Sequence, residues 1–358
     1  MRRATPIARA RSRRLSSRLG SLIVAGVLAG SGACGGSDGD DGARSSPAPA
    51  SSDRATKELP AAAAGETDLR EAGATGISLD SGWLTAGADG VWSTNENGVV
   101  RLDPSTGRVV ATIKLPEGLP CLATETGFGA LWTATCGPGG LARIDPGRGQ
   151  ATTHVRLPVA VALGPEGSIG VGTDGIWLVV DGPDCSGCRL VRVDPETMRV
   201  TARVTVDEGS HAVRTGAGFV WVTNPDANTV QQVHPGRKRV VRTVDVGVAP
   251  FSLAVAHGAA WTLNQVDGTI TRVDARTGKT KTIAADLAGA AFDIAAGGGW
   301  IWATAGTVLL SRIDPRTNQV VERYGPALGS STVAVGYGAV WIGSGDIKTV
   351  WRLPIPPR

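Results

Sequence analysis

The most regular feature of the sequence is a short apolar segment that ends in tryptophan and recurs along most of the chain. Two small or apolar residues precede the indole in each copy, as in Gly90-Val91-Trp92 and Ala339-Val340-Trp341. Successive tryptophans are 40, 45, 44, 40, 41 and 39 residues apart, at Trp92, Trp132, Trp177, Trp221, Trp261, Trp302 and Trp341. A period of this length fits four short strands, so the pattern predicts seven similar four-stranded units.

A second pattern follows the tryptophan in most units. Arg, an apolar residue, Asp and Pro occur together at Arg101–Pro104, Arg143–Pro146, Arg192–Pro195 and Arg312–Pro315, with Arg272–Ala275 as a close variant. Such turns have clear mechanics, because Asp accepts backbone hydrogen bonds, Pro presets φ and a following Gly or Asn takes the left-handed conformation. These aspartates recur at one place in five units, which favours a structural role over a catalytic one.

The two patterns predict an all-β fold, a seven-bladed β-propeller of four-stranded blades. The last unit stops after its third strand, at Thr349–Leu353. The segment Ala74–Ser78 precedes the first inner strand and can supply the missing outer strand. An N-terminal strand would then complete the last blade, close the ring and remove its open edge. We expect the propeller to occupy residues 73–358.

The amino terminus has the pattern of an export signal over residues 1–33. Its arginines precede an apolar run, Leu19–Gly30, which is shorter than the roughly 20 residues that span a bilayer. Ser31-Gly-Ala-Cys34 resembles a bacterial lipobox, with Ser31 where an aliphatic residue is usual, and predicts lipid attachment at Cys34. Ordinary cleavage after Ala33 is the alternative, and the export route stays open. Residues 34–72 are rich in Gly, Ser, Ala and Pro and predict a disordered tether.

The charge of the chain changes when this signal is set aside. The formal net charge is +4, but residues 1–33 hold seven arginines and no acid, so the remainder carries 4 − 7 = −3. A mildly acidic protein gives no bulk electrostatic support for binding phosphate, and no nucleic-acid partner is expected.

Cysteine usage agrees with an oxidising compartment. The chain has five cysteines, and a lipid on Cys34 leaves an even number. Cys121 and Cys136 flank one predicted hairpin, and Cys185 and Cys188 share a short loop, so we expect two local disulfides. A thioredoxin-like redox motif would need a helix next to Cys185, and the sequence around it predicts none. A zinc site made from both cysteine pairs would need distant blades to meet, so we do not expect one.

The repeats resemble those of YVTN-type propellers, and most closely those of the virginiamycin B (streptogramin) lyases. Gly218–Asn224 and Asp103–Val110 carry the resemblance, which extends over residues 74–354. It implies opening of a cyclic depsipeptide by proton abstraction and elimination, with His and Glu at the propeller mouth and a divalent metal. Among the four histidines, His211 begins an inner strand at the mouth, so a lyase-like base would be His211, assisted by Glu208 or Glu117. A second histidine is lacking there, and no other cofactor is expected.

Two classes of function therefore remain. The first is a non-catalytic binding or interaction module, exported to the cell surface or periplasm, that meets a protein or small molecule at the propeller mouth. The second is a metal-assisted lyase or hydrolase at the same mouth, with a quinone-dependent enzyme as a distant third. Whether the protein is an enzyme stays open. We expect a monomer that contacts the membrane only through its lipid. The sparse, scattered histidines favour the first class.

Overall fold

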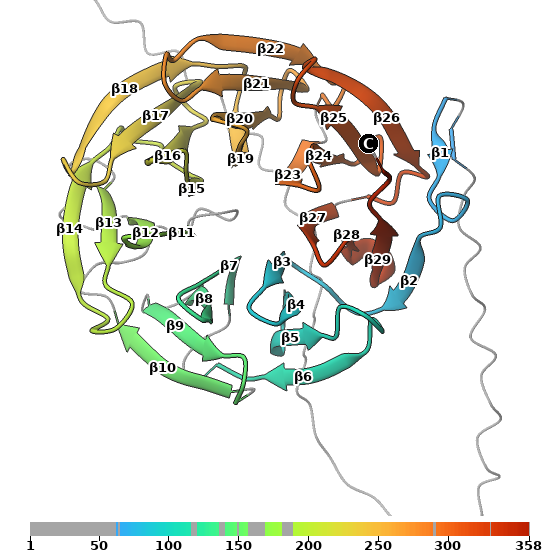
Figure 1. The fold of residues 1–358 in the computed structure, drawn as a ribbon, viewed down its shortest axis with the longest axis horizontal. Helices are drawn as coiled ribbons and strands as arrows, with labels where there is room; N and C mark the ends of the chain where they lie inside the picture. The colour runs from blue at the N-terminus through green and yellow to red at the C-terminus, as the bar shows by residue number, and fades with distance from the viewer. Residues whose placement is uncertain are drawn as a thin grey trace, which may run out of the picture. The chain divides into compact units, whose positions relative to one another are not determined.

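The computed structural model describes residues 62–63, 65–115, 120–135, 140–148, 150–156, 169–180, 189–288, 291–329 and 331–357. Seven antiparallel four-stranded blades are arranged in a ring around a central axis (Figure 1). The predicted seven-bladed β-propeller is therefore confirmed. None of the helical turns in these ranges is long and apolar enough to cross a bilayer.

Each blade runs from an inner strand at the axis to an outer strand at the rim (Figure 1). Blades one to three consist of β3 (Leu84–Gly87), β4 (Gly90–Asn95), β5 (Gly98–Leu102) and β6 (Val109–Ile113); β7 (Pro120–Gly127), β8 (Ala130–Thr135), β9 (Gly140–Asp145) and β10 (Gln150–Arg156); and β11 (Ile169–Gly172), β12 (Gly175–Val180), β13 (Arg189–Val193) and β14 (Val200–Thr205).

Blades four to seven continue the same order. They consist of β15 (Val213–Gly216), β16 (Phe219–Asn224), β17 (Thr229–His234) and β18 (Arg239–Asp245); β19 (Pro250–Ala256), β20 (Ala259–Asn264), β21 (Thr269–Asp274) and β22 (Thr280–Ala284); β23 (Ala291–Gly297), β24 (Trp300–Ala305), β25 (Leu310–Asp314) and β26 (Gln319–Gly325); and β27 (Ser331–Gly336), β28 (Ala339–Ser344) and β29 (Thr349–Pro354). A 3-10 turn, Gly345–Ile347, joins β28 to β29.

The repeated tryptophans are the packing anchors of the blades. All seven lie on second strands and are fully buried. In six blades the indole N–H donates to the carbonyl oxygen five residues earlier, at the end of the inner strand, over 2.9–3.3 Å. In blade three Trp177 donates instead to Asp174 Oδ1 at 3.2 Å. Each large ring thus buries its apolar surface, satisfies its one donor and ties the first strand to the second.

The arginine of the second sequence pattern stacks on this anchor in blades one, two, three and five, and Arg352, which lies outside that pattern, does so in blade seven. The guanidinium carbon in these blades lies 5.5–5.9 Å from the centre of the tryptophan ring, whereas Arg312 of blade six lies over Trp300 at 4.6 Å. The strand register explains this contact, because Trp92 pairs with Arg101 and the equivalent residues pair in the other blades. Blade four has Gln232 opposite its tryptophan. The recurring arginine is therefore a cross-strand cation–π partner.

The turn aspartates have the structural role predicted for them. Asp194 accepts hydrogen bonds from the backbone N–H and the hydroxyl of Thr197, and Asp103 bonds Thr106 in the same way. The N–H and hydroxyl bonds hold the pKa of both carboxyls below the usual value of 3.8. These carboxylates therefore stabilise the turns in which they lie.

The inner strands contact one another in a closed cycle around the axis. Their last residues are small because neighbouring blades approach closely there. A Cβ added at Gly216 would lie 2.6 Å from Val255 Cγ1, and one at Gly336 would lie 2.7 Å from the Cβ of Ala86. Glycine at these strand ends lets the ring tighten around its axis.

The N-terminal segment closes the ring as predicted. β2 (Thr75–Ser78) pairs antiparallel with β29, and Ile77 lies opposite Val350. Blade seven is therefore assembled from both ends of the described chain, and its outer edge is occupied.

The boundary between tether and propeller lies earlier than the predicted residue 73. β1 (Thr67–Asp68) pairs in parallel with β26 at the rim of blade six, and Leu69 N–H donates to Gly325 O at 2.9 Å. Leu69 is only 1% exposed and packs in the cluster that contains Trp302 and Tyr324. The prediction that the tether reaches residue 72 is wrong for this stretch, because one buried leucine and two strand residues bind it to the ring.

Several sequence predictions concern residues outside the described ranges. These are the signal over 1–33, the lipid site Cys34, the rest of the tether, Glu117, and the cysteines at 136, 185 and 188. Cys121 lies on β7, but its side chain is also outside the description. The lipid and disulfide assignments therefore stay predictions.

Replacing Leu69 with Ala tests whether this early segment is part of the fold. We expect L69A to lower the free energy of unfolding by about 2–4 kcal/mol, because it removes a fully buried side chain from the core of blade six. The exposed neighbour Glu71 is the matched control, and E71A should change stability by less than about 0.5 kcal/mol. Equal denaturant midpoints for L69A and the unmodified protein would show that the segment does not support the ring.

Candidate functional site

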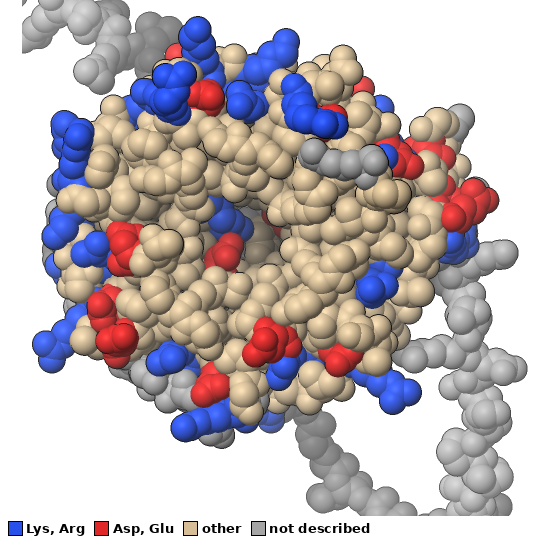
Figure 2. All heavy atoms as spheres, in the orientation of Figure 1, with Lys and Arg blue, Asp and Glu red and all other residues tan. Residues whose placement is uncertain are grey.

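A cavity of about 240 Å³ lies on the axis, lined by the inner strands of blades one, two and four to seven. Figure 2 looks along the axis and shows basic and acidic side chains inside the central opening. The charged residues that line the cavity are Glu125 on β7, Arg214 on β15 and Asp293 on β23. Buried charged side chains are uncommon inside a fold, which makes this cavity the candidate site.

Two of these charges occupy the same place in their repeats. The inner-strand residue paired with each anchor tryptophan stands seven positions before it, and this residue is Thr85, Glu125, Gly170, Arg214, Ala254, Ala295 and Ala334 in blades one to seven. Blades two and four therefore carry opposite charges at a position that is otherwise small or neutral. Gly170 lies between them, on the inner strand of blade three.

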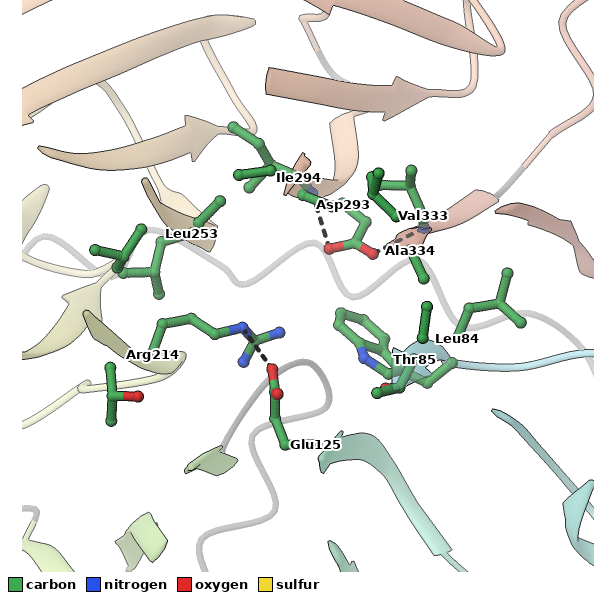
Figure 3. A pocket seen from close by; sticks show the side chains of 17 residues that line it. Leu84, Thr85, Glu125, Arg214, Leu253, Asp293, Ile294, Val333 and Ala334 are labelled. Carbon is green, nitrogen blue, oxygen red and sulfur yellow. Dashed lines mark hydrogen bonds and ion pairs between the residues drawn. The ribbon is translucent and has the colours of Figure 1, made fainter. Parts of the chain in front are cut away.

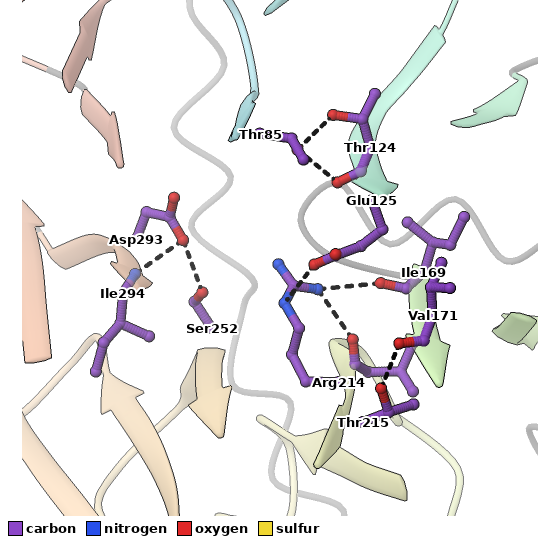
Figure 4. A network of polar contacts seen from close by, with 11 residues as sticks. Thr85, Thr124, Glu125, Ile169, Val171, Arg214, Thr215, Ser252, Asp293 and Ile294 are labelled. Atoms are coloured by element: carbon purple, nitrogen blue, oxygen red, sulfur yellow. Dashed lines mark hydrogen bonds and ion pairs between the residues drawn. The ribbon is translucent and has the colours of Figure 1, made fainter. Parts of the chain in front are cut away.

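The glycine in blade three allows Arg214 and Glu125 to meet. A Cβ at Gly170 would lie 3.2 Å from Arg214 Cα, so the main chains of blades three and four are in close contact. Arg214 Nε lies 3.3 Å from Glu125 Oε1, and its Nη1 donates to the carbonyl oxygens of Ile169 and Val213 at 3.1 and 2.9 Å (Figure 4). The guanidinium thereby links three blades.

Asp293 lies across the cavity from this ion pair (Figure 3). It is 2% exposed. Its Oδ1 accepts the Ile294 N–H at 2.8 Å and the Ser252 hydroxyl at 3.1 Å, and its Oδ2 accepts the Val333 N–H at 2.9 Å. The carboxylate therefore joins blades five, six and seven, as the ion pair joins blades two to four.

Burial dominates the electrostatics of both acids. Burial raises the pKa of Glu125, and the Arg214 charge opposes this while Asp293 adds to it. Burial also raises the pKa of Asp293, against the Val333 N–H and the Arg214 charge. One guanidinium thus faces two carboxyl groups, and the Asp293 charge disfavours ionisation of Glu125.

His211, the predicted catalytic base, lies outside the lining of this cavity. It precedes β15 and is 9% exposed, with its ring packed edge-on against Phe251 at 4.8 Å. Nδ1 lies 3.1 Å from the carbonyl oxygen of Phe251, so this nitrogen carries the proton in the neutral ring. Burial lowers the pKa of His211, which keeps the imidazole neutral at physiological pH. Nε2 is buried without a polar partner in the described structure.

The predicted assistants of His211 are not assembled around it in the described structure. Glu208 is exposed, and its carbonyl oxygen, rather than its side chain, accepts a hydrogen bond from Asn224. Glu117 lies outside the described ranges. Within those ranges no three His, Cys, Asp or Glu side chains gather as metal ligands, so the residues described do not fit the divalent metal that the lyase resemblance implies. The catalytic roles of His211, Glu208 and Glu117 stay predictions.

The axial residues can be recognised in the sequence as exceptions to the repeat. When the seven repeats are aligned on their tryptophans, the position seven residues earlier is charged in only two of them. Asp293 is the acidic residue at the position nine residues earlier, where the other repeats have Trp83, Ala123, Ser168, Ala212, Ser252 and Thr332. Departures from a repeat's consensus mark residues that blade packing does not require.

Sequence comparison gives no family for this chain. No protein-family model matches it, and no curated protein matches its sequence.

Solved structures share its fold. BamB from Moraxella catarrhalis superimposes with a TM-score of 0.56 at 12% identity, covering 78% of this chain and 98% of that one. Hydrazine synthase from Kuenenia stuttgartiensis gives 0.63 at 14% identity, covering 78% and 97%. A chain of the Mitotic Checkpoint Complex gives 0.65 at 12% identity, covering 88% and 98%. At such identities the likeness establishes the propeller fold alone.

A double-mutant cycle on Arg214 and Glu125 tests whether the axial ion pair couples the blades. R214M should lower the free energy of unfolding by about 2–4 kcal/mol, because it leaves a carboxylate and two carbonyl oxygens without their donor. R214M/E125Q should be less destabilised than the sum of the single variants, with a coupling energy of about 1–3 kcal/mol. If the losses of unfolding free energy in the two single variants simply add up in urea unfolding, the coupling energy is zero and the ion pair does not couple the blades.

Proposed function

We propose that this chain is an exported, lipid-anchored β-propeller that acts as a non-catalytic binding module at the cell surface or in the periplasm, with its binding site at the axial cavity. The observation that carries the proposal is the set of charged side chains held at the axis by contacts from six blades. Side chains fixed in this way need little reordering when a ligand arrives, which favours binding.

The fixed geometry suits recognition better than acid–base chemistry. The Asp293 carboxylate accepts three hydrogen bonds, and the Glu125 carboxylate pairs with Arg214. The candidate base, His211, is buried against Phe251 and away from the cavity lining. A streptogramin-lyase-like activity would need His211, a glutamate and a metal to meet, and the described residues give it no support.

The fold comparison supports an interaction role by analogy only. A chain of similar fold belongs to the Mitotic Checkpoint Complex, a protein assembly. Propellers present a broad face of turns around the axis, and a protein partner can rest on that face while it reaches into the cavity.

Export and anchoring are proposed from the amino terminus. The Arg-rich start, the apolar run and Cys34 have the pattern of a lipoprotein signal. The tether would then let the propeller stand away from the membrane, and the first described strand, β1, begins only at Thr67.

A cysteine substitution tests the anchor. In a bacterial host, the full-length chain should sediment with membranes and be released by detergent, whereas C34A should be recovered in the soluble or secreted fraction. S37A, three residues away, is the matched control and should sediment like the unmodified chain. Membrane sedimentation of C34A to the same extent would rule out the lipid on this cysteine.

Site-specific photo-crosslinking tests the binding face. Val266 is 59% exposed in the turn between β20 and β21, beside the start of the cavity-lining strand β19, whereas Val110 is 53% exposed on the outer strand β6. A photoreactive phenylalanine at position 266 should give an adduct of defined mass in intact cells, and the same residue at position 110 should not. The proposed face is wrong if position 110 gives the same adduct, and a protein partner there is excluded if neither position gives one.

A further inference from the structure

Much of the hydrogen-bonding capacity that the axial cavity offers to a ligand is that of acceptors. Among the described residues, Arg214 carries the one guanidinium of the lining, and its Nε and Nη1 already donate to Glu125 and to the carbonyl oxygens of Ile169 and Val213. Three of its five N–H groups are therefore bonded to the wall between blades two and four, while its charge also acts on Asp293.

The hydroxyl groups of the lining also donate to the wall. Thr215 Oγ1 donates to Val171 O at 2.6 Å, and Thr85 Oγ1 lies 2.7 Å from both the carbonyl and the hydroxyl oxygen of Thr124 (Figure 4). A hydroxyl whose proton points at a carbonyl can offer only lone pairs to a ligand.

The two carboxylates retain acceptor sites of their own. A carboxylate has about four lone-pair sites, and Asp293 uses three of them. Glu125 accepts from Arg214 and from the Thr126 N–H. These free acceptor sites favour a ligand that donates hydrogen bonds.

The charge of the lining specifies the sign of the ligand. Two carboxyl groups and one guanidinium leave one negative charge when both acids are ionised, so a single positive charge balances the cavity. Burial raises the pKa of both acids, and a bound cation would favour their ionised forms.

The shape of the cavity selects an organic cation. The apolar part of the wall is made by Ala254, Ala295 and Ala334, which stand at the same repeat position as Glu125 and Arg214. A volume of about 240 Å³ equals that of roughly eight water molecules, enough for a short alkyl chain with a charged end. The described residues offer no group of three metal ligands.

We infer that the axial cavity binds a primary ammonium group carried on a short unbranched alkyl chain, with the nitrogen between Asp293 and Glu125 and the chain along the apolar wall. The inference rests on the proposed binding function and names the chemistry of its ligand. The ammonium can belong to a free alkylamine or to a lysine side chain of a partner, since both present the same group.

Calorimetric titration of the purified full-length chain with three probes of equal length tests this inference. Pentylammonium should bind saturably at a 1:1 ratio, whereas 1-pentanol and pentanoate should bind at least about tenfold more weakly, because they lack the charge or reverse it. Nα-acetyl-lysine methylamide, compared with its norleucine analogue, separates the two sources. Binding of the lysine probe indicates a partner's side chain, and its exclusion while pentylammonium binds indicates a free amine.

Two isosteric variants assign the site. E125Q and D293N should each weaken pentylammonium binding by about tenfold, because each removes one charge-assisted hydrogen bond, while E196Q, at an exposed turn of blade three, should leave it unchanged. E125Q leaves the hydrogen bonds of Asp293 intact, so it decides the matter if D293N fails to fold. Equal affinity for pentanol and pentylammonium, or unchanged affinity in folded E125Q, would overturn the inference. Neither result would alter the crosslinking or membrane outcomes, which test the proposed function separately.

Discussion

The fold depends on one contact that is repeated in every blade: a buried indole that joins the first two strands. The ring buries its apolar surface, donates its N–H in six blades to the end of the inner strand, and in most blades carries an arginine from the third strand on its face. Because this contact sets the position of each inner strand, it also sets what faces the axis. The cavity is thus a consequence of blade packing, and its chemistry is determined by the few inner-strand residues that differ between blades.

The periodic part of the structure was predictable from the sequence because packing demands repetition. Trp221 and its six counterparts gave the number of blades, and turns such as Asp194–Thr197 gave the order of strands within them. The strand β2 was predictable because the last repeat lacks its fourth strand. β1 was not, since two residues and a single buried leucine leave no pattern that can be recognised among the Ala- and Gly-rich residues around them.

The candidate site was harder to predict because it consists of exceptions to the repeat. Arg214 and Glu125 meet only because Gly170 stands in the blade between them, and Asp293 is fixed by main-chain groups from its own and a neighbouring blade. No motif records these relations, although an alignment of the seven repeats shows the exceptional residues. His211 attracted attention by its place at the start of an inner strand, but its ring lies against Phe251. A place just before an inner strand does not by itself direct a side chain into the cavity.

The axial charges and the blade contacts form one system. Arg214 and Asp293 both hold neighbouring inner strands together, and the same bonds leave carboxylate oxygens directed into the cavity. A crystal structure of the full-length chain grown with an alkylammonium salt would examine this arrangement most directly. We expect density for one cation whose nitrogen lies within hydrogen-bonding distance of Asp293 and Glu125, with the Arg214–Glu125 pair unchanged. Water alone in the cavity at saturating amine, or a cation bound only elsewhere, would contradict it.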